Sequence, residues 1–504
     1  MITPDTAQEA AFDLSLIKHI PLTYAKTNMV LPVKRDLSVL MGYISDMQGA
    51  FALSEIAKSL ALKAEPVMIT PEKLLNLINR IYGMAGSAEE VMDNMTEGDF
   101  DTVATEFESP KDIVELTEDA PIIRLLNALL RQAVKENASD IHIEPYEKDL
   151  QVRMRIDGVL RKILMPPKII QDALISRVKI MANMDIAQRR LPQDGRIRLL
   201  ISGKDIDVRV SIIPSVFGER AVLRILDRKQ GLMGLSALGL DDVTKGKLEN
   251  LLARPHGIFL VTGPTGSGKT TTLYAALNHI YTEEKNIITI EDPVEYQIRG
   301  MAQIGVNPRI GLTFANGLRS VLRHDPDVIM VGEIRDYDTA EIAVQASLTG
   351  HLVLSTLHTN DAASSVTRLI DMGVEPFLIA SSLCGVLAQR LIRVICPECK
   401  ERYEATEPQR SYFNFPVETL FKGRGCTKCN NTGYAGRIGI FELFIIDQGV
   451  LPLINSNTDS TAIRNYALES GMKTLRQDGL MKAAVGRTSL QEVLRVTQRD
   501  DAGI

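Results

Sequence analysis

The chain of 504 residues is too long to fold around one hydrophobic core, so we expect three or four domains. It has no tryptophan and few aromatic residues. Its formal net charge is −6 without a strongly basic segment, which argues against a large nucleic-acid footprint. The first six residues lack the basic and apolar regions of a signal peptide, and no apolar stretch approaches the roughly 20 residues that span a bilayer. We therefore expect a cytoplasmic protein whose membrane contacts come through partners.

The first 90 residues are predicted to form a small helical N-terminal module, with residues 37–41 and 71–78 as examples of its segments. A strongly acidic stretch follows. Residues 91–118 are predicted to be a flexible linker, because like charges repel and little apolar area can be buried there. A solvated face of a folded segment is the alternative interpretation.

An α+β domain is predicted over residues 119–230. An amphipathic helix begins near residue 120, and helical spacing returns over residues 169–187. Alternating apolar and polar residues indicate half-buried strands at residues 140–144, 150–156 and 206–212. A glycine-rich connector over residues 231–239 separates this domain from the next.

From residue 257 onward, apolar runs alternate with helical stretches, which is the pattern of an α/β fold with a twisted, mainly parallel sheet. Buried parallel strands are predicted at residues 258–261, 287–290, 328–331 and 352–356.

A glycine-rich turn after the strand at 258–261 has the sequence of a phosphate-binding P-loop. Its glycines let several backbone N–H groups point at one centre, and the next helix adds the positive end of its dipole. Lys269 is predicted to reach the β- and γ-phosphates, and the Thr270 hydroxyl to coordinate Mg²⁺. A turn that only joins a strand to a helix is the alternative, but it does not account for Lys-Thr at their fixed offset. The predicted nucleotide-binding residues of the loop are Gly263, Pro264, Thr265, Gly266, Ser267, Gly268, Lys269 and Thr270.

Carboxylates follow two of the predicted strands, at the end where ligands bind in open α/β sheets. Glu333 comes just after the strand at 328–331. It is predicted to orient or deprotonate the attacking water, or to hold Mg²⁺ through water. Glu291 and Asp292 follow the strand at 287–290 and are predicted to contribute to the metal and water shell. A surface carboxylate is the alternative for Glu333, and a plain acidic turn for the other two.

Two histidines bracket the strand at 352–356. His358 lies at its C-terminal end, where a neutral imidazole can donate a hydrogen bond to a γ-phosphate and report hydrolysis to the following helix. His351 lies at the opposite end. A structural histidine is the alternative for either residue.

Four of the five cysteines stand in two CxxC pairs. Each pair forms a two-thiolate knuckle, and four thiolates complete a tetrahedral Zn²⁺ shell, so we predict a structural zinc site with no open coordination position. A redox dithiol is the alternative, but the rest of the sequence does not look thioredoxin-like. Cys384 is unpaired and is predicted to be a small core residue. The predicted zinc ligands are Cys396, Cys399, Cys426 and Cys429.

Several motifs together resemble those of one ATPase superfamily. From about residue 118 to its C-terminal end, the chain is similar to the secretion ATPases of type II secretion and type IV pilus assembly. The cysteine-bearing segment favours the assembly side, because pilus-retraction ATPases usually lack it. The motifs that carry the resemblance are the P-loop and residues 138–145, 191–196, 218–220, 291–293, 332–336 and 349–360.

The resemblance implies a RecA-like P-loop ATPase domain over residues 231–395 and a tetracysteine zinc-binding insert over 396–440. Residues 441–504 would then be a C-terminal helical part of the ATPase domain. A homohexameric ring is implied as well, in which ATP lies between the ATPase domain and the flexibly joined α+β domain.

Two arginines of the α+β domain match residues that, in this superfamily, reach the γ-phosphate when the domains close. They are Arg209 and Arg224, and a positive charge there would stabilise the transition state. Exposed strand arginines are the alternative. Arg153, Arg155 and Arg220 compete for the role.

Within the superfamily, the single N-terminal module of about 90 residues and the total length favour type II secretion. The resemblance then implies an enzyme that hydrolyses ATP to ADP and phosphate, and that drives pseudopilus assembly and protein export across the outer membrane. Residues 1–90 would dock on the cytoplasmic domain of an inner-membrane secretion protein, which places the ATPase on the cytoplasmic face of that membrane. An inner-membrane platform protein is the implied target of the stroke, and acidic phospholipid is a further candidate partner.

Three alternatives stay open from the sequence. A type IV pilus assembly ATPase would carry similar motifs, usually behind a longer N-terminal part. A nucleic-acid motor would need a basic lining or stacking aromatic residues, and neither stands out, so no nucleic-acid partner is expected. A nucleotide-gated scaffold with negligible turnover is the third alternative.

Overall fold

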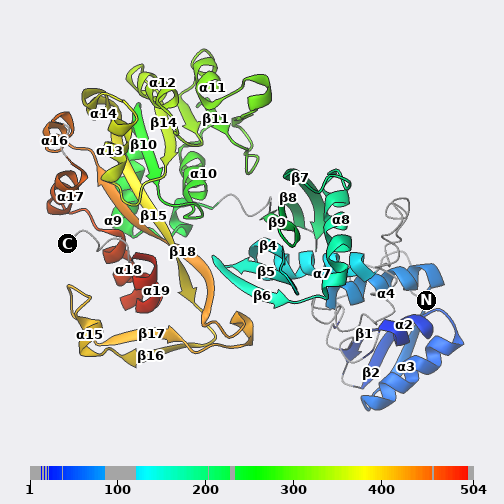
Figure 1. Ribbon diagram of the computed structural model, residues 1–504. Coiled ribbons are helices and arrows are strands. Elements are labelled where there is room, and N and C mark those ends of the chain that lie inside the picture. The colour runs from blue at the N-terminus through cyan, green and yellow to red at the C-terminus, as the bar shows by residue number, and fades with distance from the viewer. Residues whose placement is uncertain are drawn as a thin grey trace. The chain divides into compact units, whose positions relative to one another are not determined.

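The computed structural model describes residues 13, 16, 20, 22–36, 38–85, 121–201, 204–227, 233–456 and 459–497 (Figure 1). Internal contacts divide the chain into two compact units, residues 1–226 and residues 227–504. The acidic linker predicted at residues 91–118 lies outside the described residues. Within the described part of the chain, no helix is both long enough and apolar enough to cross a membrane.

The N-terminal module has a mixed α/β structure, so the prediction of a small helical module is wrong. Residues 39–41 belong to strand β2 (Val39–Ile44), where every second residue is buried, whereas a helix would bury residues three and four apart. Strand β1 (Val30–Asp36) pairs antiparallel with β2, and β3 (Lys63–Met68) pairs parallel with it. The helix predicted at 71–78 is confirmed as part of α4. The helices of the module are α2 (Leu22–Thr27), α3 (Met47–Ser59) and α4 (Pro71–Ala85).

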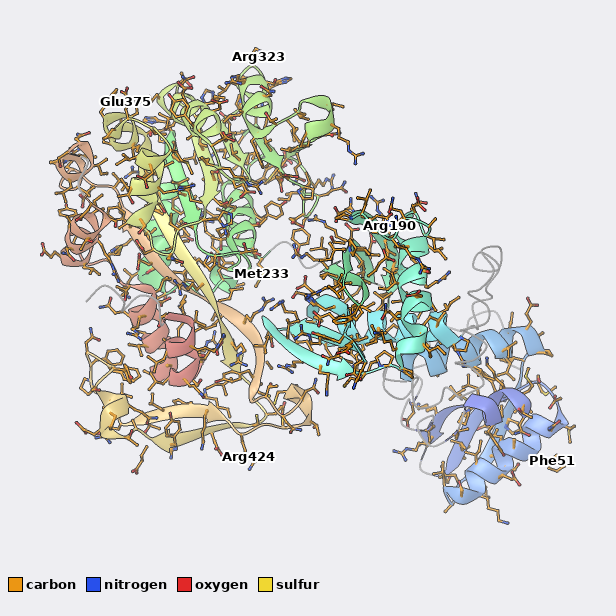
Figure 2. All side chains as sticks on the ribbon, in the orientation of Figure 1. Phe51, Arg190, Met233, Arg323, Glu375 and Arg424 are labelled. Atoms are coloured by element: carbon orange, nitrogen blue, oxygen red, sulfur yellow. The ribbon has the colours of Figure 1, made fainter. Side chains whose placement is uncertain are left out.

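Helix α3 presents large apolar side chains to solvent. Met47 is 71% exposed and Phe51 is 70% exposed, and Figure 2 shows Phe51 on the outer side of the helix. On the neighbouring strand β3, Met68 is 66% exposed. Exposed apolar groups gathered on one small module are typical of an interaction surface.

The rest of the first unit contains a six-stranded sheet in the order β6-β5-β4-β9-β8-β7. The predicted helix near residue 120 and the three predicted strands are confirmed. The helix predicted over residues 169–187 ends earlier, at Met181, because Asn183 adopts a left-handed conformation with φ +57° and the Met184 N–H bonds back to the Lys179 carbonyl. The elements are α7 (Pro121–Lys135), β4 (Ala138–Pro145), β5 (Leu150–Ile156), β6 (Val159–Leu164), η1 (Lys168–Ile170), α8 (Gln171–Met181), β7 (Gln193–Ile201), β8 (Lys204–Ser215) and β9 (Gly218–Asp227).

A seven-stranded sheet forms the centre of the second unit, in the order β12-β11-β13-β14-β10-β15-β18 (Figure 1). Neighbouring strands from β12 to β15 pair parallel, and β18 pairs antiparallel with β15. The predicted parallel strands are confirmed. Their successive residues face opposite sides, so Leu260 and Val353 join one core while Phe259 and Leu354 join the other.

The strands of this sheet are β10 (Gly257–Thr262), β11 (Ile287–Glu291), β12 (Ala302–Gly305), β13 (Val328–Val331), β14 (Leu352–Leu357), β15 (Leu383–Ile395) and β18 (Tyr434–Ile445). Its helices are η2 (Leu235–Ala237), α9 (Asp242–Leu252), α10 (Lys269–Ile280), η3 (Pro308–Ile310), α11 (Phe314–Val321), α12 (Tyr337–Leu348), α13 (Ser364–Asp371) and α14 (Pro376–Ser382).

Strands β15 and β18 continue beyond the sheet as a two-stranded arm that carries the cysteine-bearing segment (Figure 1). Leu420 of this segment shares a hydrophobic core with Leu480 and Val493 of the C-terminal helices. The expected end of the insert at residue 440 falls inside β18, whose pairing with β15 runs on to Ile445. The elements of this region are β16 (Lys400–Glu404), α15 (Glu407–Arg410), β17 (Thr419–Gly423), η4 (Thr427–Cys429), α16 (Leu451–Asn455), α17 (Ser460–Glu469), α18 (Leu475–Ala484) and α19 (Leu490–Thr497).

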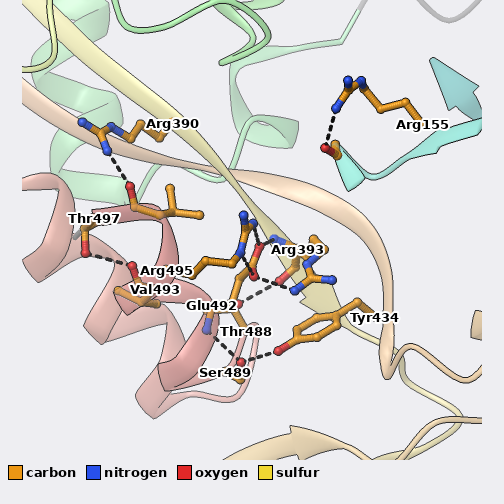
Figure 3. A network of polar contacts seen from close by, with 12 residues as sticks. Arg155, Arg390, Arg393, Tyr434, Thr488, Ser489, Glu492, Val493, Arg495 and Thr497 are labelled. Atoms are coloured by element: carbon orange, nitrogen blue, oxygen red, sulfur yellow. Dashed lines mark hydrogen bonds and ion pairs between the residues drawn. The ribbon is translucent and has the colours of Figure 1, made fainter. Parts of the chain in front are cut away.

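A buried carboxylate fastens the arm to α19 (Figure 3). Glu492 is 1% exposed and accepts hydrogen bonds from the guanidinium groups of Arg393 (2.8 Å) and Arg495 (2.6 Å). Burial raises the pKa of Glu492, but the two arginines outweigh it and hold the pKa below its usual value. Nearby, the Tyr434 hydroxyl lies 2.6 Å from the Ser489 hydroxyl. The arm is therefore held to the C-terminal helices by charged and neutral hydrogen bonds together.

Candidate active site and metal site

The glycine-rich loop joins the C-terminal end of β10 to the first turn of α10. Gly263 and Gly268 have φ angles of +145° and +89°, which residues with a Cβ rarely adopt. A Cβ on Gly263 would also lie 2.4 Å from the carbonyl oxygen of Gln389. The loop therefore needs glycine at these positions both for its conformation and for its close packing.

Lys269 is 9% exposed, and its ammonium group turns back over the loop. It donates to the carbonyl oxygens of Gly263 (2.7 Å) and Pro264 (3.2 Å). Burial lowers the pKa of Lys269, and the charge of Glu333 opposes that shift. The Ser267 hydroxyl is buried and has no hydrogen-bond partner among the described residues. A buried cation and a buried hydroxyl beside a glycine loop at a helix N-terminus fit the phosphates of a nucleotide.

Three sequence-predicted residues meet at the C-terminal ends of β10, β13 and β14. The Nε2 atom of His358 lies 3.1 Å from Oε2 of Glu333, and its Nδ1 atom lies 3.5 Å from Nζ of Lys269. An ammonium group only donates, so Nδ1 accepts and Nε2 carries the proton that Glu333 accepts. His358 thus bridges the cation and the carboxylate through its two ring nitrogens.

Glu333 also pairs with Arg335, two residues further along the chain. Burial raises the pKa of Glu333, but hydrogen bonds from Arg335 and His358 outweigh that effect and keep the pKa below its ordinary value. Glu333 is therefore ionised at neutral pH and can accept a proton or orient a water molecule.

The structure separates the two acidic residues at the end of β11, because Glu291 is the last residue of the strand and Asp292 follows it. Glu291 is 3% exposed and accepts hydrogen bonds from Tyr274, Thr289 (2.7 Å) and Gln303 (3.1 Å), so both of its oxygens have protein partners. Asp292 is exposed, and its charge acts on Arg335, the partner of Glu333. Asp292 thus acts on the charged cluster of Lys269, Glu333, Arg335 and His358 through Arg335, and Glu291 ties α10 to β11 and β12.

His351 precedes β14, at the opposite edge of the sheet from the P-loop. Its Nδ1 atom donates to the carbonyl oxygen of Ala346 at 2.8 Å and lies 3.1 Å from the Thr349 hydroxyl. These contacts close the turn between α12 and β14, as expected for a structural histidine.

The candidate arginines lie in the first unit, on the six-stranded sheet. Arg224 of β9 bonds to Asp140 at 3.1 Å, and Arg153 bonds to Glu144 at 2.6 and 2.8 Å. Arg209 of β8 stands opposite Arg196 in the pairing with β7. The reach of Arg209 and Arg224 toward the P-loop stays a prediction.

The four paired cysteines form one cluster, with all four sulfur atoms within 4.8 Å of one another. Cys396 and Cys426 are 3.8 Å apart at sulfur, Cys399 and Cys429 are also 3.8 Å apart, and Cys426 and Cys429 are 3.7 Å apart. Zn–S bonds of about 2.3 Å in a tetrahedron require S–S separations of about 3.8 Å. The donor set and its spacing therefore fit zinc. Cys384 lies elsewhere, buried in the sheet core.

Sequence reasoning missed Gln389 and Thr272, which contact each other beneath the P-loop at 2.6 Å. Thr272 belongs to the helix after the motif, and Gln389 is far away in sequence on β15. No local motif marks Gln389, and its position follows only from the pairing of β15 with β10.

A buried carboxylate on β18 holds the loop that follows His358. Glu442 is 2% exposed, and its Oε1 atom accepts the N–H of Ala362 at 2.8 Å. Burial raises the pKa of Glu442 to about 7. The Ala362 bond and Arg464 oppose the rise, and Asp361 adds to it.

Glu442→Gln is expected to gain stability relative to the wild type as pH rises. The carboxyl group binds its proton more tightly in the folded chain than in the unfolded chain. Its contribution to the free energy of unfolding is therefore complete below the unfolded pKa of 4.5, and it is lost as pH rises through the folded pKa of about 7. The difference in unfolding free energy between variant and wild type should grow by roughly 3 kcal/mol between pH 4.5 and pH 8. Denaturant unfolding across this range measures it, and a constant difference would contradict the prediction.

A strand, a P-loop and a helix in a mainly parallel sheet place the protein among the P-loop ATPases. Residues 115–495 match the family described as type II/IV secretion system protein, and residues 5–88 match the MshEN domain. The chain therefore belongs to the type II/IV secretion system protein family.

Relatives with assigned names cover nearly the whole chain. The chain is 48% identical over 489 residues to the type II secretion system ATPase E of Vibrio cholerae serotype O1, and the match covers 96% of this chain and 97% of that protein. It is 47% identical over 486 residues to the type II secretion system protein E of Dickeya dadantii, covering 95% of this chain and 97% of that protein. The solved structure of the pilus retraction motor PilT with bound ADP is 27% identical, with a TM-score of 0.50, and covers 73% of this chain and 95% of that one.

Proposed function

We propose that this chain is the ATPase of a type II secretion machine, and that it hydrolyses ATP to drive pseudopilus assembly and protein export across the outer membrane. Relatives with that system's name match both the N-terminal module and the ATPase region. The main support for ATP hydrolysis at this site is that Lys269 and Glu333 contact opposite ring nitrogens of His358.

In the proposed reaction, the N–H groups of the loop and Lys269 bind the phosphates of ATP. The Thr270 hydroxyl would hold Mg²⁺, which neutralises charge on the β- and γ-phosphates. Glu333 orients the attacking water and accepts its proton. His358 donates through Nε2 to Glu333 or to the γ-phosphate, so its contacts change when that phosphate leaves.

Asp292 joins the charged cluster through Arg335 and supports the metal and water shell. Glu291, held by Tyr274 and Gln303, fixes the position of the loop that carries Asp292. Arg209 and Arg224 of the other unit stabilise the γ-phosphate when the two units close on the nucleotide, and hydrolysis lets them reopen.

We further propose a homohexamer on the cytoplasmic face of the inner membrane, with an inner-membrane platform protein as the target of its stroke. The exposed Met47 and Phe51 support docking of the N-terminal module on the cytoplasmic domain of an inner-membrane secretion protein. Acidic phospholipid is a second candidate surface. Zinc in the four-cysteine cluster is proposed as a structural metal.

Phosphate release by the purified full-length protein tests the ATPase site. Lys269→Ala is expected to lower both ATP binding and phosphate release at least about 100-fold, because the main cation on the phosphates is removed. Lys245→Ala is the matched control, since Lys245 lies on α9 and pairs there with Glu249 at 3.7 Å. Wild-type hydrolysis by Lys269→Ala would contradict the proposed site.

Complementation tests the cellular role. In a bacterium whose own type II secretion ATPase gene is deleted, the wild-type chain should restore an exported enzyme to the culture medium. Lys269→Ala should not restore it. Failure of the active wild-type protein to restore export, with pilus assembly restored instead, would overturn the secretion assignment.

A further inference from the structure

Gln389 lies beneath the P-loop although it is far from the loop in sequence. It is 2% exposed. The parallel pairing of β10 with β15 ends at Thr262 and Ala388, so Gln389 is the next residue of β15, at the level where β10 turns into the loop. Neither the nucleotide-binding motif nor the charged cluster includes this residue.

Gln389 contacts the loop at two points and the following helix at a third. Its Oε1 atom accepts a hydrogen bond of 2.6 Å from the Thr272 hydroxyl, on the first turn of α10, and this bond is fully buried. Its backbone carbonyl oxygen packs against Gly263, where a Cβ would come within 2.4 Å. Its side-chain amide nitrogen packs against Gly268, where a Cβ would come within 2.8 Å. One residue thus touches the beginning of the loop, its end and the helix behind it.

We propose that Gln389 is a positioning residue for nucleotide binding, which holds the P-loop and the first turn of α10 in the shape that receives phosphate. It does not touch the substrate. Glycine-rich loops lose much conformational freedom when they bind, so a loop that is already held in shape binds more tightly. This inference rests on the proposed function, in which ATP binds at the loop.

Strand β15 is firmly held where it carries Gln389. The neighbouring Arg390 donates to the carbonyl oxygen of Val496 on α19. Arg393 pairs with the buried Glu492 at 2.8 Å (Figure 3). On the other side, β15 pairs continuously with β18 around Gln389. The loop therefore rests on a strand that is fixed from both sides.

The test uses ATP affinity of the full-length protein, measured for Gln389→Leu, Thr272→Val and the double variant. Each single variant is expected to weaken ATP binding about tenfold, because each removes the buried hydrogen bond between strand and helix. The double variant should bind ATP no more weakly than Gln389→Leu does, since both changes break the same contact. The KM for ATP should rise with this loss, while kcat at saturating ATP should stay within about threefold of the wild type.

Two matched controls separate positioning from general stability. Gln171 is a buried glutamine of the first unit that donates to the Phe217 carbonyl, and Thr497 is a buried threonine of α19 that donates to the Val493 carbonyl. Gln171→Leu and Thr497→Val are expected to lower the unfolding temperature and leave ATP affinity unchanged.

Wild-type ATP affinity in both Gln389→Leu and Thr272→Val, with an unfolding temperature lowered as in the controls, would overturn the inference and leave Gln389 as a packing residue. The proposed function fails by a different result, which is wild-type ATP affinity in Lys269→Ala. Different variants therefore distinguish failure of this inference from failure of the proposed function.

Discussion

Glu333→Gln is expected to hydrolyse ATP at least about 100-fold more slowly than the wild type while binding ATP with similar affinity. In the wild type, Nε2 of His358 lies 3.1 Å from Glu333. Glutamine has nearly the same shape and can still accept this hydrogen bond, but it cannot take a proton from water. Single-turnover phosphate release and equilibrium nucleotide binding, measured on the same preparation, check both parts of the prediction.

The control for this change is Glu341→Gln, which alters a carboxylate on α12 that accepts a hydrogen bond from Tyr337 at 3.2 Å. It should hydrolyse ATP at the wild-type rate. If Glu333→Gln turned over ATP as fast as this control, Glu333 would have no role as base or water-orienting group. A variant that lost ATP binding as well would instead point to a part in holding the nucleotide.

Four strands of the central sheet, β10, β11, β13 and β14, could be predicted because they are short, mostly apolar runs that are buried along their whole length. The P-loop could be predicted because its residue types occur at fixed spacing after such a strand. The meeting of Glu333 and His358 was predictable only in part, because the sequence places both just after strands, whereas the pairing of β13 with β14 comes from the structure. The four-cysteine cluster could also be predicted from local sequence, because each CxxC pair supplies two of the four ligands.

Other features could not be predicted, for non-local or ambiguous reasons. Residues 37–41 are a short apolar run that fits a helix or a strand equally well, and only the pairing of β2 with β1 and β3 decides it. The side chain of Glu291 turns toward Tyr274 of α10 and Gln303 of β12, partners that the order of residues around Glu291 does not reveal. Gln389 is a similar case, because its contact with Thr272 depends on the register between two strands.

Cys429→Ser is expected to abolish zinc binding and to loosen the segment between β15 and β18. Removing one thiolate leaves three ligands, and a structural zinc site contributes on the order of 10 kcal/mol to the folding of the residues around it. Cys429 also accepts backbone N–H groups of Cys426 (3.2 Å) and Gly433 (3.3 Å), so the knuckle loses contacts as well as the ion. Metal content per chain and amide hydrogen exchange over residues 396–440 measure the two effects.

Cys384→Ala provides the matched control, because this cysteine is buried in the sheet core away from the cluster and should leave the zinc content unchanged. The increase in amide hydrogen exchange should also differ along the chain. Leu420 packs with Leu480 and Val493, and Glu492 holds the arm through Arg393, so the C-terminal helices should keep their protection from exchange when zinc is lost. Undiminished zinc in Cys429→Ser would show that the cluster is not the metal site. Exchange that spread through α18 and α19 would show that the metal, rather than the apolar core and the Glu492 contacts, holds this end of the protein together.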